Sequence, residues 1–203
     1  MRRRFSNWRL ITTGAMKVVP QIIDEEYITE RKVLSDGRRL VRTSASAWSK
    51  AEAWVESHPW DNRYWLRYGS QRNTSDPVVF TNKVVKWINN TTSVKSEPGS
   101  FRGVKTPIIA MVVIGLEDGG NERIHCHGVI LSAEPLKTKA IRKRYGLGHS
   151  SLRKYDTREN GVRYALDHHW LLQDVGAFQV KRSVGKYSDE ELSRLTLQAR
   201  LRN

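Results

Sequence analysis

The sequence predicts an α+β fold, in which helices pack on a central antiparallel β-sheet. The apolar, β-branched run at 107–116 (PIIAMVVIGL) predicts a buried strand. The turn sequence DGGN at 118–121 follows it, and a second strand at 123–131 (RIHCHGVIL) returns from the turn. Amphipathic helices with capping residues stand on both sides of this hairpin, which completes the α+β pattern.

The segment before the hairpin contains two predicted strands and two predicted helices. Strands are expected at 8–13 (WRLITT) and, by alternation, at 63–68 (RYWLRY). A helix is expected at 46–57 (SAWSKAEAWVES), because Pro59 lies just beyond its end. A second helix is expected at 77–89, because an aspartate and a proline form a good N-cap and first-turn pair before apolar residues at helical spacing. These residues are Asp76, Pro77, Phe80, Val84, Trp87 and Ile88.

After the hairpin, Glu134 and Pro135 open a basic helix that is expected to end at Gly146 or Gly148. A short strand is then expected at 150–155, a helix at 157–172, a strand at 177–182 and a C-terminal helix at 186–203. Both of these last helices begin with acceptor residues at capping-box spacing. These residues are Asp156 with Glu159 and Ser188 with Glu191.

The size and composition of the chain indicate one domain. Its 203 residues are 38% hydrophobic, enough for one compact core, so we expect 1–203 to be a single domain. Within it, 76–185 carries the motifs, and 1–75 is either an additional recognition element or part of the sheet. One cysteine allows no internal disulfide, and neither a secretory signal nor an apolar run of about 20 residues is found.

The chain is strongly basic along its whole length. Thirty-five Lys and Arg residues against 21 Asp and Glu residues give a net charge of +14. A protein this basic usually binds a polyanion, most often nucleic acid, and the seven Trp and seven Tyr residues include rings that could stack on bases. The alternatives are charge for solubility and binding to an anionic membrane surface.

The strand at 123–131 contains a candidate metal site. Successive side chains of a strand face opposite ways, so His125 and His127 share one face and Cys126 points into the core on the other. Two imidazoles side by side are half of a divalent-metal site. Glu117 joins them if the turn leaves an odd number of unpaired residues, because it then pairs with Arg123; a two-residue turn would place it on the opposite face.

A tyrosine on the helix expected at 157–172 could use this metal. Tyr164 shares a helix face with Asp167 and His168, which follow it by three and four residues. Two imidazoles and a carboxylate suit Mn²⁺, Mg²⁺ or another first-row ion, whereas a structural zinc site would need four closed ligands. Gly128 is expected to leave room beside the histidines for a nucleic-acid backbone.

Three stretches together resemble the HUH superfamily of single-strand DNA endonucleases, above all the rolling-circle replication initiators of small phages, viruses and plasmids. They are Glu117, the RIHCHGVIL strand at 123–131 and GVRYALD at 161–167, and the resemblance covers about 76–172 in order. The family's tyrosine motif usually reads Tyr-x-x-Lys, but this chain has Asp167 at the lysine position. Another basic side chain does the lysine's work, or that role is unfilled. The family's first motif has its nearest counterpart at 10–13.

The resemblance implies a central antiparallel sheet of about five strands. It also implies metal-dependent, site-specific nicking and joining of single-stranded DNA through a 5′-phosphotyrosine, which initiates rolling-circle replication. It implies Tyr164 as nucleophile. Because an ordinary phenol is mostly protonated at neutral pH, the metal, nearby cations or Asp167 acting as base must help this attack. The implied ligands of a Mn²⁺ or Mg²⁺ ion are Glu117, His125 and His127, with His168 added by likeness to some HUH transposases. The candidate DNA contacts are Arg123, Lys143, Arg144, Arg153, Lys154 and Arg163.

The implied partners are an origin hairpin, a host helicase and a host polymerase, and no membrane is involved. A host helicase is needed because the sequence contains no Walker motif. The implied location is the host cytoplasm, or the nucleus of a eukaryotic host. A relaxase or a single-strand transposase would carry the same motifs. A non-catalytic basic nucleic-acid-binding protein and a structural metal protein are the alternatives from other classes. Tyr145 and Tyr155 compete with Tyr164 as nucleophile.

Overall fold

The structure is a computed structural model, and it describes more than half of the chain. The described residues are 16–21, 23–69, 76–92, 105–117, 124–136, 138, 150–156, 158, 160–167, 169–173 and 175–182. Within them, nine strands form one sheet in which each pair of neighbouring strands is antiparallel, accompanied by three α-helices and a short 3-10 helix. The predicted α+β class is confirmed, and the sheet is larger than the expected five strands.

Strands and helices alternate irregularly along the chain. In order, the elements are β1 (Met16–Gln21), the 3-10 helix η1 (Glu25–Tyr27), β2 (Ile28–Val33), β3 (Arg39–Thr43), α1 (Ala45–Glu56), β4 (Asn62–Gly69), α2 (Pro77–Thr91), β5 (Ile108–Glu117), β6 (His125–Ser132), β7 (Ser151–Lys154), α4 (Gly161–Asp167), β8 (His169–Leu172) and β9 (Ala177–Arg182).

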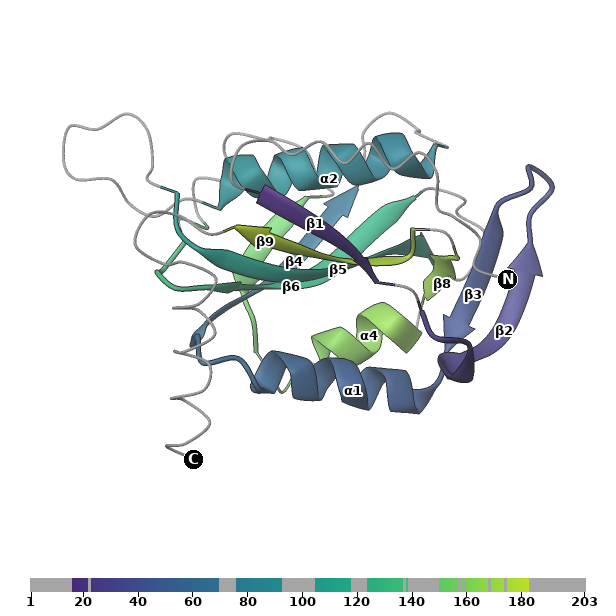
Figure 1. Ribbon diagram of the computed structural model, residues 1–203, viewed down its shortest axis with the longest axis horizontal. Coiled ribbons are helices and arrows are strands. Elements are labelled where there is room, and N and C mark those ends of the chain that lie inside the picture. Colours follow the sequence, from purple (N-terminus) through teal and green to yellow (C-terminus); the bar gives the residue numbers. More distant parts are fainter. Residues whose placement is uncertain are drawn as a thin grey trace.

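Strands β5 and β6 form the central pair of the sheet (Figure 1). The strand order is β2-β3-β8-β5-β6-β4-β7, and β9 pairs with both β1 and β5. One edge of β5 pairs with β6 from Ile108 to Gly115. Its other edge pairs first with β9 and then with β8, so both of these strands lie beside β5.

Several predicted elements are confirmed. The helix expected at 46–57 is α1, the one expected at 77–89 is α2, and the strands expected at 63–68 and 177–182 are β4 and β9. The expected strands at 107–116 and 150–155 are β5 and β7. The Asp76 side chain caps α2, since its Oδ1 accepts hydrogen bonds from the backbone N–H groups of Val78 and Val79 at 2.8 and 3.1 Å.

The N-terminal part of the described chain belongs to the sheet. Strand β4 lies between β6 and β7, and β1 pairs along β9. Strands β2 and β3 form a hairpin at one end of the sheet (Figure 1). The strand expected at 8–13, most of the basic helix expected after Pro135, and the helix expected at 186–203 lie outside the described residues.

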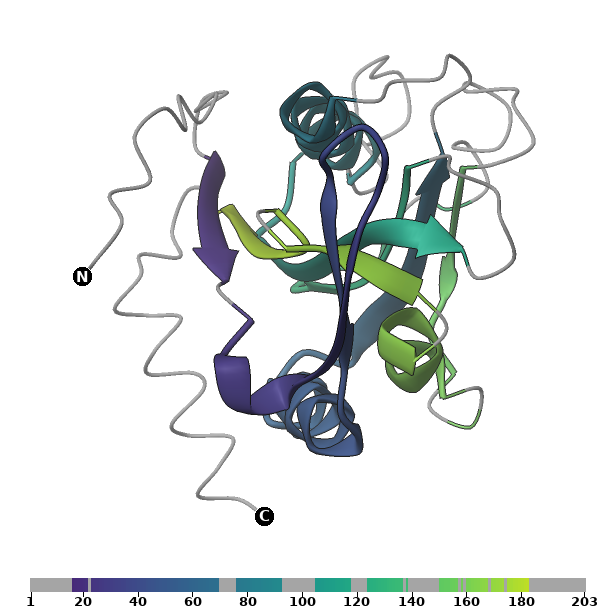
Figure 2. The same cartoon turned by 90° about the vertical axis from the view of Figure 1, so that its right-hand side faces the viewer.

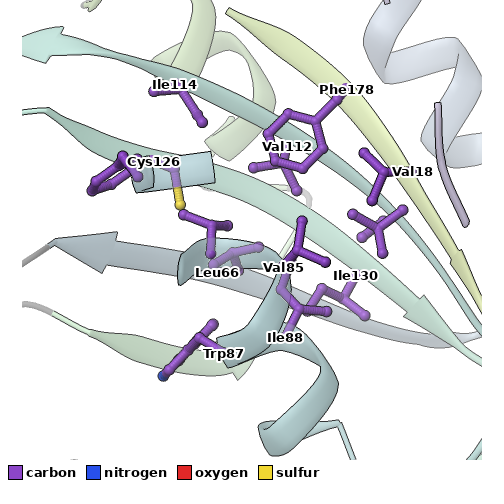
Figure 3. Close-up of a cluster of buried hydrophobic side chains, with 14 of the residues drawn as sticks. Val18, Leu66, Val85, Trp87, Ile88, Val112, Ile114, Cys126, Ile130 and Phe178 are labelled. Carbon is purple, nitrogen blue, oxygen red and sulfur yellow. The ribbon is translucent and has the colours of Figure 1, made fainter. Parts of the chain in front are cut away.

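Helices cover both faces of the sheet. Helix α2 packs on one face, and α1 and α4 pack side by side on the other (Figures 1 and 2). Apolar side chains fill the core beneath α2, among them Leu66, Ile88 and Ile130 (Figure 3). Cys126 lies in this core, fully buried, as predicted, and burial raises the pKa of its thiol.

The predicted helix at 157–172 is wrong at both ends. Helix α4 begins only at Gly161, because Asn160 adopts a left-handed conformation with φ 47°. The helix stops at Asp167, and the chain continues as β8, in which Leu171 pairs with Gly115 of β5 and Val41 of β3. Pairing with these two strands overrides the helical spacing of the local sequence. Among the described residues, no helix has the length and apolar character to cross a bilayer.

A candidate metal centre beside an exposed tyrosine

Three buried histidines meet on the face of the sheet that α1 and α4 cover. His125 and His127 come from β6, and His169 is the first residue of β8. One ring nitrogen from each of them lies within 4.8 Å of the others, a spacing at which the three could hold one metal ion. The shared face that alternation predicted for His125 and His127 is therefore observed, and His169 is a third member that the sequence did not reveal.

Gly115 allows the histidines of two separate strands to meet. Strand β5 runs between β6 and β8, and Gly115 is opposite His125 on one side and Leu171 on the other. A Cβ atom at this position would lie 2.4 Å from the carbonyl oxygen of Trp170 and 3.4 Å from Cβ of His169. Because glycine has no side chain, the rings of His125 and His169 approach to 4.7 Å between centroids across β5.

The backbone of α4 fixes the tautomer of His169. Its Nδ1 lies 3.1 Å from the carbonyl oxygen of Ala165 and 3.3 Å from that of Tyr164. A carbonyl oxygen only accepts, so Nδ1 carries the proton, and the lone pair of the neutral ring is on Nε2. Hydrogen bonds of this kind commonly orient metal-binding imidazoles, so His169 is prepared to bind a metal through Nε2.

His127 supplies the test of whether a metal fits. Both of its ring nitrogens are buried, and neither has a hydrogen-bond partner among the described residues. Burial, together with the charges of the neighbouring histidines and of Arg67, lowers the pKa of His127 to about 2. The ring is therefore neutral at physiological pH, the form that binds metals. Since a buried polar atom without a partner is unfavourable, a metal ion would satisfy an otherwise costly arrangement.

Tyr164 stands directly beside the three histidines. It extends from α4, and its side chain is 44% exposed although the histidines are buried. Its ring centroid lies 5.7 Å from that of His127 and 5.4 Å from that of His169, edge to face in both cases. The site thus combines a buried group of metal-binding nitrogens with a phenol that solvent and a substrate can reach.

The ring of Trp65 separates Tyr155 from the histidines. It stacks on Trp65 at 6.3 Å between centroids, and it is Trp65 that faces His127, at 5.4 Å. Burial raises the pKa of the Tyr155 phenol, which disfavours its nucleophilic form. Of the two competing tyrosines inside the described chain, Tyr164 therefore has the better position, and Tyr145 lies outside it.

The strand register assigns the position of Glu117 in β5 to the histidine face. Gly115 pairs with His125, and Glu117 follows two residues later in β5, so both positions belong to the same face. On the other edge of β5, Glu117 pairs with His169. This is the odd-loop register that the sequence left open. The side chain of Glu117 lies outside the described residues.

The other predicted site residues are placed only in part. His168 and the side chain of Asp167 lie outside the described residues. The helix that carries Tyr164 is described only as far as Asp167, so the role predicted for His168 stays a prediction. The residue after it, His169, occupies the site. Alternation of His169 with Leu171, together with the glycine inside β5, was the signal available in the sequence.

The predicted DNA contacts divide between the two faces. Arg153 is exposed and pairs with Trp65 on the histidine face, and Arg163 is exposed on α4 with its guanidinium 5.3 Å from the Trp48 ring. Lys154 belongs to the opposite face, where its ammonium lies 5.6 Å from the Tyr64 ring. Three further candidates lie outside the described residues, namely Arg123, Lys143 and Arg144.

The expectation for Gly128 is wrong. This residue is buried inside the sheet, and a Cβ atom there would lie 2.3 Å from the carbonyl oxygen of Met111. It alternates with the histidines and faces α2, so its missing side chain serves the close pairing of β6 with β5. It gives a nucleic acid no approach to the histidines.

Comparison with known proteins adds no relative. No protein-family model, no curated protein and no solved structure matches this chain. What the site does is therefore argued from its own geometry and chemistry.

Proposed function

We propose that this protein is a metal-dependent single-strand DNA endonuclease of the HUH type, which nicks and joins DNA through a covalent bond to Tyr164 and thereby initiates rolling-circle replication. One observation carries the proposal: an exposed phenol lies in ring contact with a buried group of three metal-binding histidines. The HUH-like order of motifs and the charge of +14 support it independently.

His125, His127 and His169 would hold the metal. Glu117, whose backbone pairs with His169 in the sheet, would add a carboxylate. Three imidazoles favour Mn²⁺ or another first-row transition ion over Mg²⁺, which prefers oxygen ligands and retains several waters. A cation bound there would polarise the scissile phosphate and stabilise the negative charge that builds on its oxygens.

Tyr164 is the nucleophile of the proposed reaction. Its phenolic oxygen bonds to phosphorus as the bond to the 3′-oxygen breaks, which leaves a 5′-phosphotyrosine and a free 3′-hydroxyl. Asp167, three residues later in α4, takes the phenolic proton, and the departing 3′-oxygen gains one. The bond to tyrosine conserves the phosphodiester, so attack by a 3′-hydroxyl at the same site rejoins a strand.

Basic side chains around the site would hold the DNA strand. Arg153 and Arg163 are exposed on elements that border the histidine face. Contacts of this kind release counterions, so binding should weaken as salt rises. The free 3′-hydroxyl would prime a host polymerase after a host helicase separates the strands. A relaxase or a transposase of the same superfamily would use the same chemistry in another process.

The test is the formation of a covalent complex. The full chain is incubated with Mn²⁺ and a library of labelled single-stranded oligonucleotides, with and without hairpins, and then analysed on a denaturing gel. We expect a labelled protein band that depends on Mn²⁺ and disappears with EDTA. A chain that binds the library but never forms this band would be a non-catalytic binder. A chain that unfolds in EDTA would hold a structural metal instead.

A further inference from the structure

Arg67 is a charged residue beside the histidines to which the sequence assigned no role. It lies on β4, directly opposite His127 of β6 in the strand register, and its side chain is exposed. Side chains directly opposite in an antiparallel pair have Cβ atoms about 4.5–5.5 Å apart. The side chain of Arg67 therefore leaves the backbone next to the buried imidazole of His127.

The face that Arg67 occupies follows from its neighbours on β4. Trp65, two residues earlier, faces the histidines, with its ring centroid 5.4 Å from that of His127. Residues two apart on a strand share a face, so Arg67 extends on the same side of the sheet. His127 is buried and Arg67 is exposed, so the arginine side chain is accessible to solvent on the face that carries the imidazole.

The histidine face then has a fixed order across the sheet. His169 of β8 comes first, Gly115 of β5 next, then His125 and His127 of β6, and finally Arg67 of β4. Tyr164 contacts the rings of His127 and His169 from α4 above them. The arginine therefore borders the site on the side away from β8.

A guanidinium in this position has a clear chemical consequence. A guanidinium next to a bound divalent cation would be repelled by it. An anion bound between the metal and the guanidinium would be attracted by both positive charges. Arginine suits a phosphate in particular, because its planar fork can donate two parallel hydrogen bonds to two oxygens.

We propose that Arg67 binds the scissile phosphate of single-stranded DNA from the β4 side of the histidines. This proposal rests on the proposed endonuclease function and names a positioning residue for it. Arg67 holds the phosphate against the site and balances the charge that develops on its oxygens during attack by Tyr164.

The first test measures phosphate binding without chemistry. Fluorescence anisotropy follows binding of an oligo(dT) strand of about 20 nucleotides over a range of KCl concentrations, with Mn²⁺ present. For single strands each lost phosphate contact reduces the slope of log K against log salt by about 0.7. We expect this reduction for Arg67→Ala and little change for Arg67→Lys. The matched control is Lys86→Ala, which removes an exposed charge on α2 across the sheet and should keep the wild-type slope.

The second test separates a phosphate contact from a structural role. Titration with Mn²⁺ alone should give Arg67→Ala an affinity equal to or higher than that of the wild type, because a repelling charge is removed. A tenfold loss of Mn²⁺ affinity would mean that Arg67 only supports the histidines, and it would overturn the proposal. Covalent complex formation by Arg67→Ala should fall at least tenfold, with partial recovery in Arg67→Lys.

The outcomes also distinguish this proposal from the proposed function. If the wild type forms no covalent complex but Arg67→Ala loses one phosphate contact, the phosphate site stands and the endonuclease proposal fails. If the wild type forms the complex and Arg67→Ala matches Lys86→Ala in both slope and rate, the role of Arg67 is refuted. A wild type that does not bind oligo(dT) would contradict both proposals.

Discussion

The two faces of strand β6 show how one strand serves two purposes. Its even positions, Cys126 and Ile130, point into the apolar core under α2 and are fully buried. Its odd positions, His125 and His127, point the other way and are also buried, but they are polar and meet a third imidazole from β8. The first face stabilises the fold, and the second brings together ring nitrogens that could hold a metal ion.

The helices on the two faces differ in the same way. Helix α2 has 15 residues and covers its face of the sheet with an apolar stripe. Helix α4 has seven residues, and its Tyr164 ring stays 44% exposed next to the histidines. The long helix α2 covers its core, whereas the short helix α4 leaves the phenol of Tyr164 exposed beside the histidines. Substitutions on the two faces should therefore affect different properties, and the following predictions test that separation.

The largest effect is expected from Tyr164→Phe. Loss of the phenolic oxygen removes the nucleophile, so the covalent DNA complex should fall below detection on a denaturing gel. The melting temperature should stay close to that of the wild type, because the substitution keeps the ring and the residue is 44% exposed. Tyr155→Phe is the matched control and should keep the complex, since Trp65 separates that ring from the histidines. The opposite pattern would make Tyr155 the nucleophile.

Metal binding should depend on the histidine face alone. A ligand at a hundred times its dissociation constant stabilises the folded state by about 2.7 kcal/mol, so Mn²⁺ should raise the melting temperature of the wild type. His127→Ala and His169→Ala should lose this increase, because each removes one nitrogen of the site. Cys126→Ala, on the other face of the same strand, should keep it. Scanning fluorimetry with Mn²⁺ and with EDTA makes the measurement.

Fold stability should depend mainly on the α2 face. Ile130→Ala leaves a cavity in a fully buried core and should lower the free energy of unfolding by about 2–5 kcal/mol in urea titrations. Its Mn²⁺ affinity, measured below the unfolding transition, should match that of the wild type. A large loss of metal affinity in Ile130→Ala would show that the two faces are coupled.

The histidine face should make the metal-free protein sensitive to acid. The pKa of His127 is about 2 in the folded chain, far below its ordinary value of 6.5, so the unfolded chain takes up this proton first as the pH falls. The free energy of unfolding should drop below pH 6.5, by about 1.4 kcal/mol for each pH unit at most. Urea titrations in EDTA at pH 7 and pH 5 should show a smaller drop for His127→Ala. Equal drops would contradict the assignment of this effect to His127.

The smallest effect concerns the single cysteine. Cys126 is fully buried and burial raises the pKa of its thiol, so the reactive thiolate is scarce in the folded chain. A thiol-specific reagent should leave the native protein unmodified at pH 8 and react fully after denaturation. Rapid reaction of the native protein would show that the core under α2 opens readily.

The sequence revealed the parts of the site that depend on local pattern. The shared face of His125 and His127 follows from strand alternation, and the position of Tyr164 follows from the helix around it. The register that brings the Glu117 backbone to the same face was one of two alternatives that the turn allowed. Helix α2 was predictable because its N-cap and its apolar spacing agree.

Long-range strand pairing places both His169 and Arg67, so a local signal such as the alternation of His169 with Leu171 could not by itself assign them to the site. His169 follows a helix whose end is decided by the pairing of β8 with β3 and β5. Arg67 is next to His127 only because β4 pairs with β6, although some 60 residues separate them in the chain. The glycine in each central strand was ambiguous for the same reason. Both lie against a backbone carbonyl oxygen, that of Trp170 at Gly115 and that of Met111 at Gly128, but only Gly115 also lies beside a histidine.

The most direct test of the central claim is mass spectrometry of the trypsin-digested covalent complex. Cleavage after Arg163 and Lys181 gives a peptide from Tyr164 to Lys181, whereas Tyr155 would be in the short peptide that ends at Arg158. We expect a nucleotide linked through phosphate to Tyr164 in the longer peptide, formed with Mn²⁺ and absent with EDTA. A nucleotide on Tyr155 or on any other residue, or a complex that forms equally well without metal, would contradict the account.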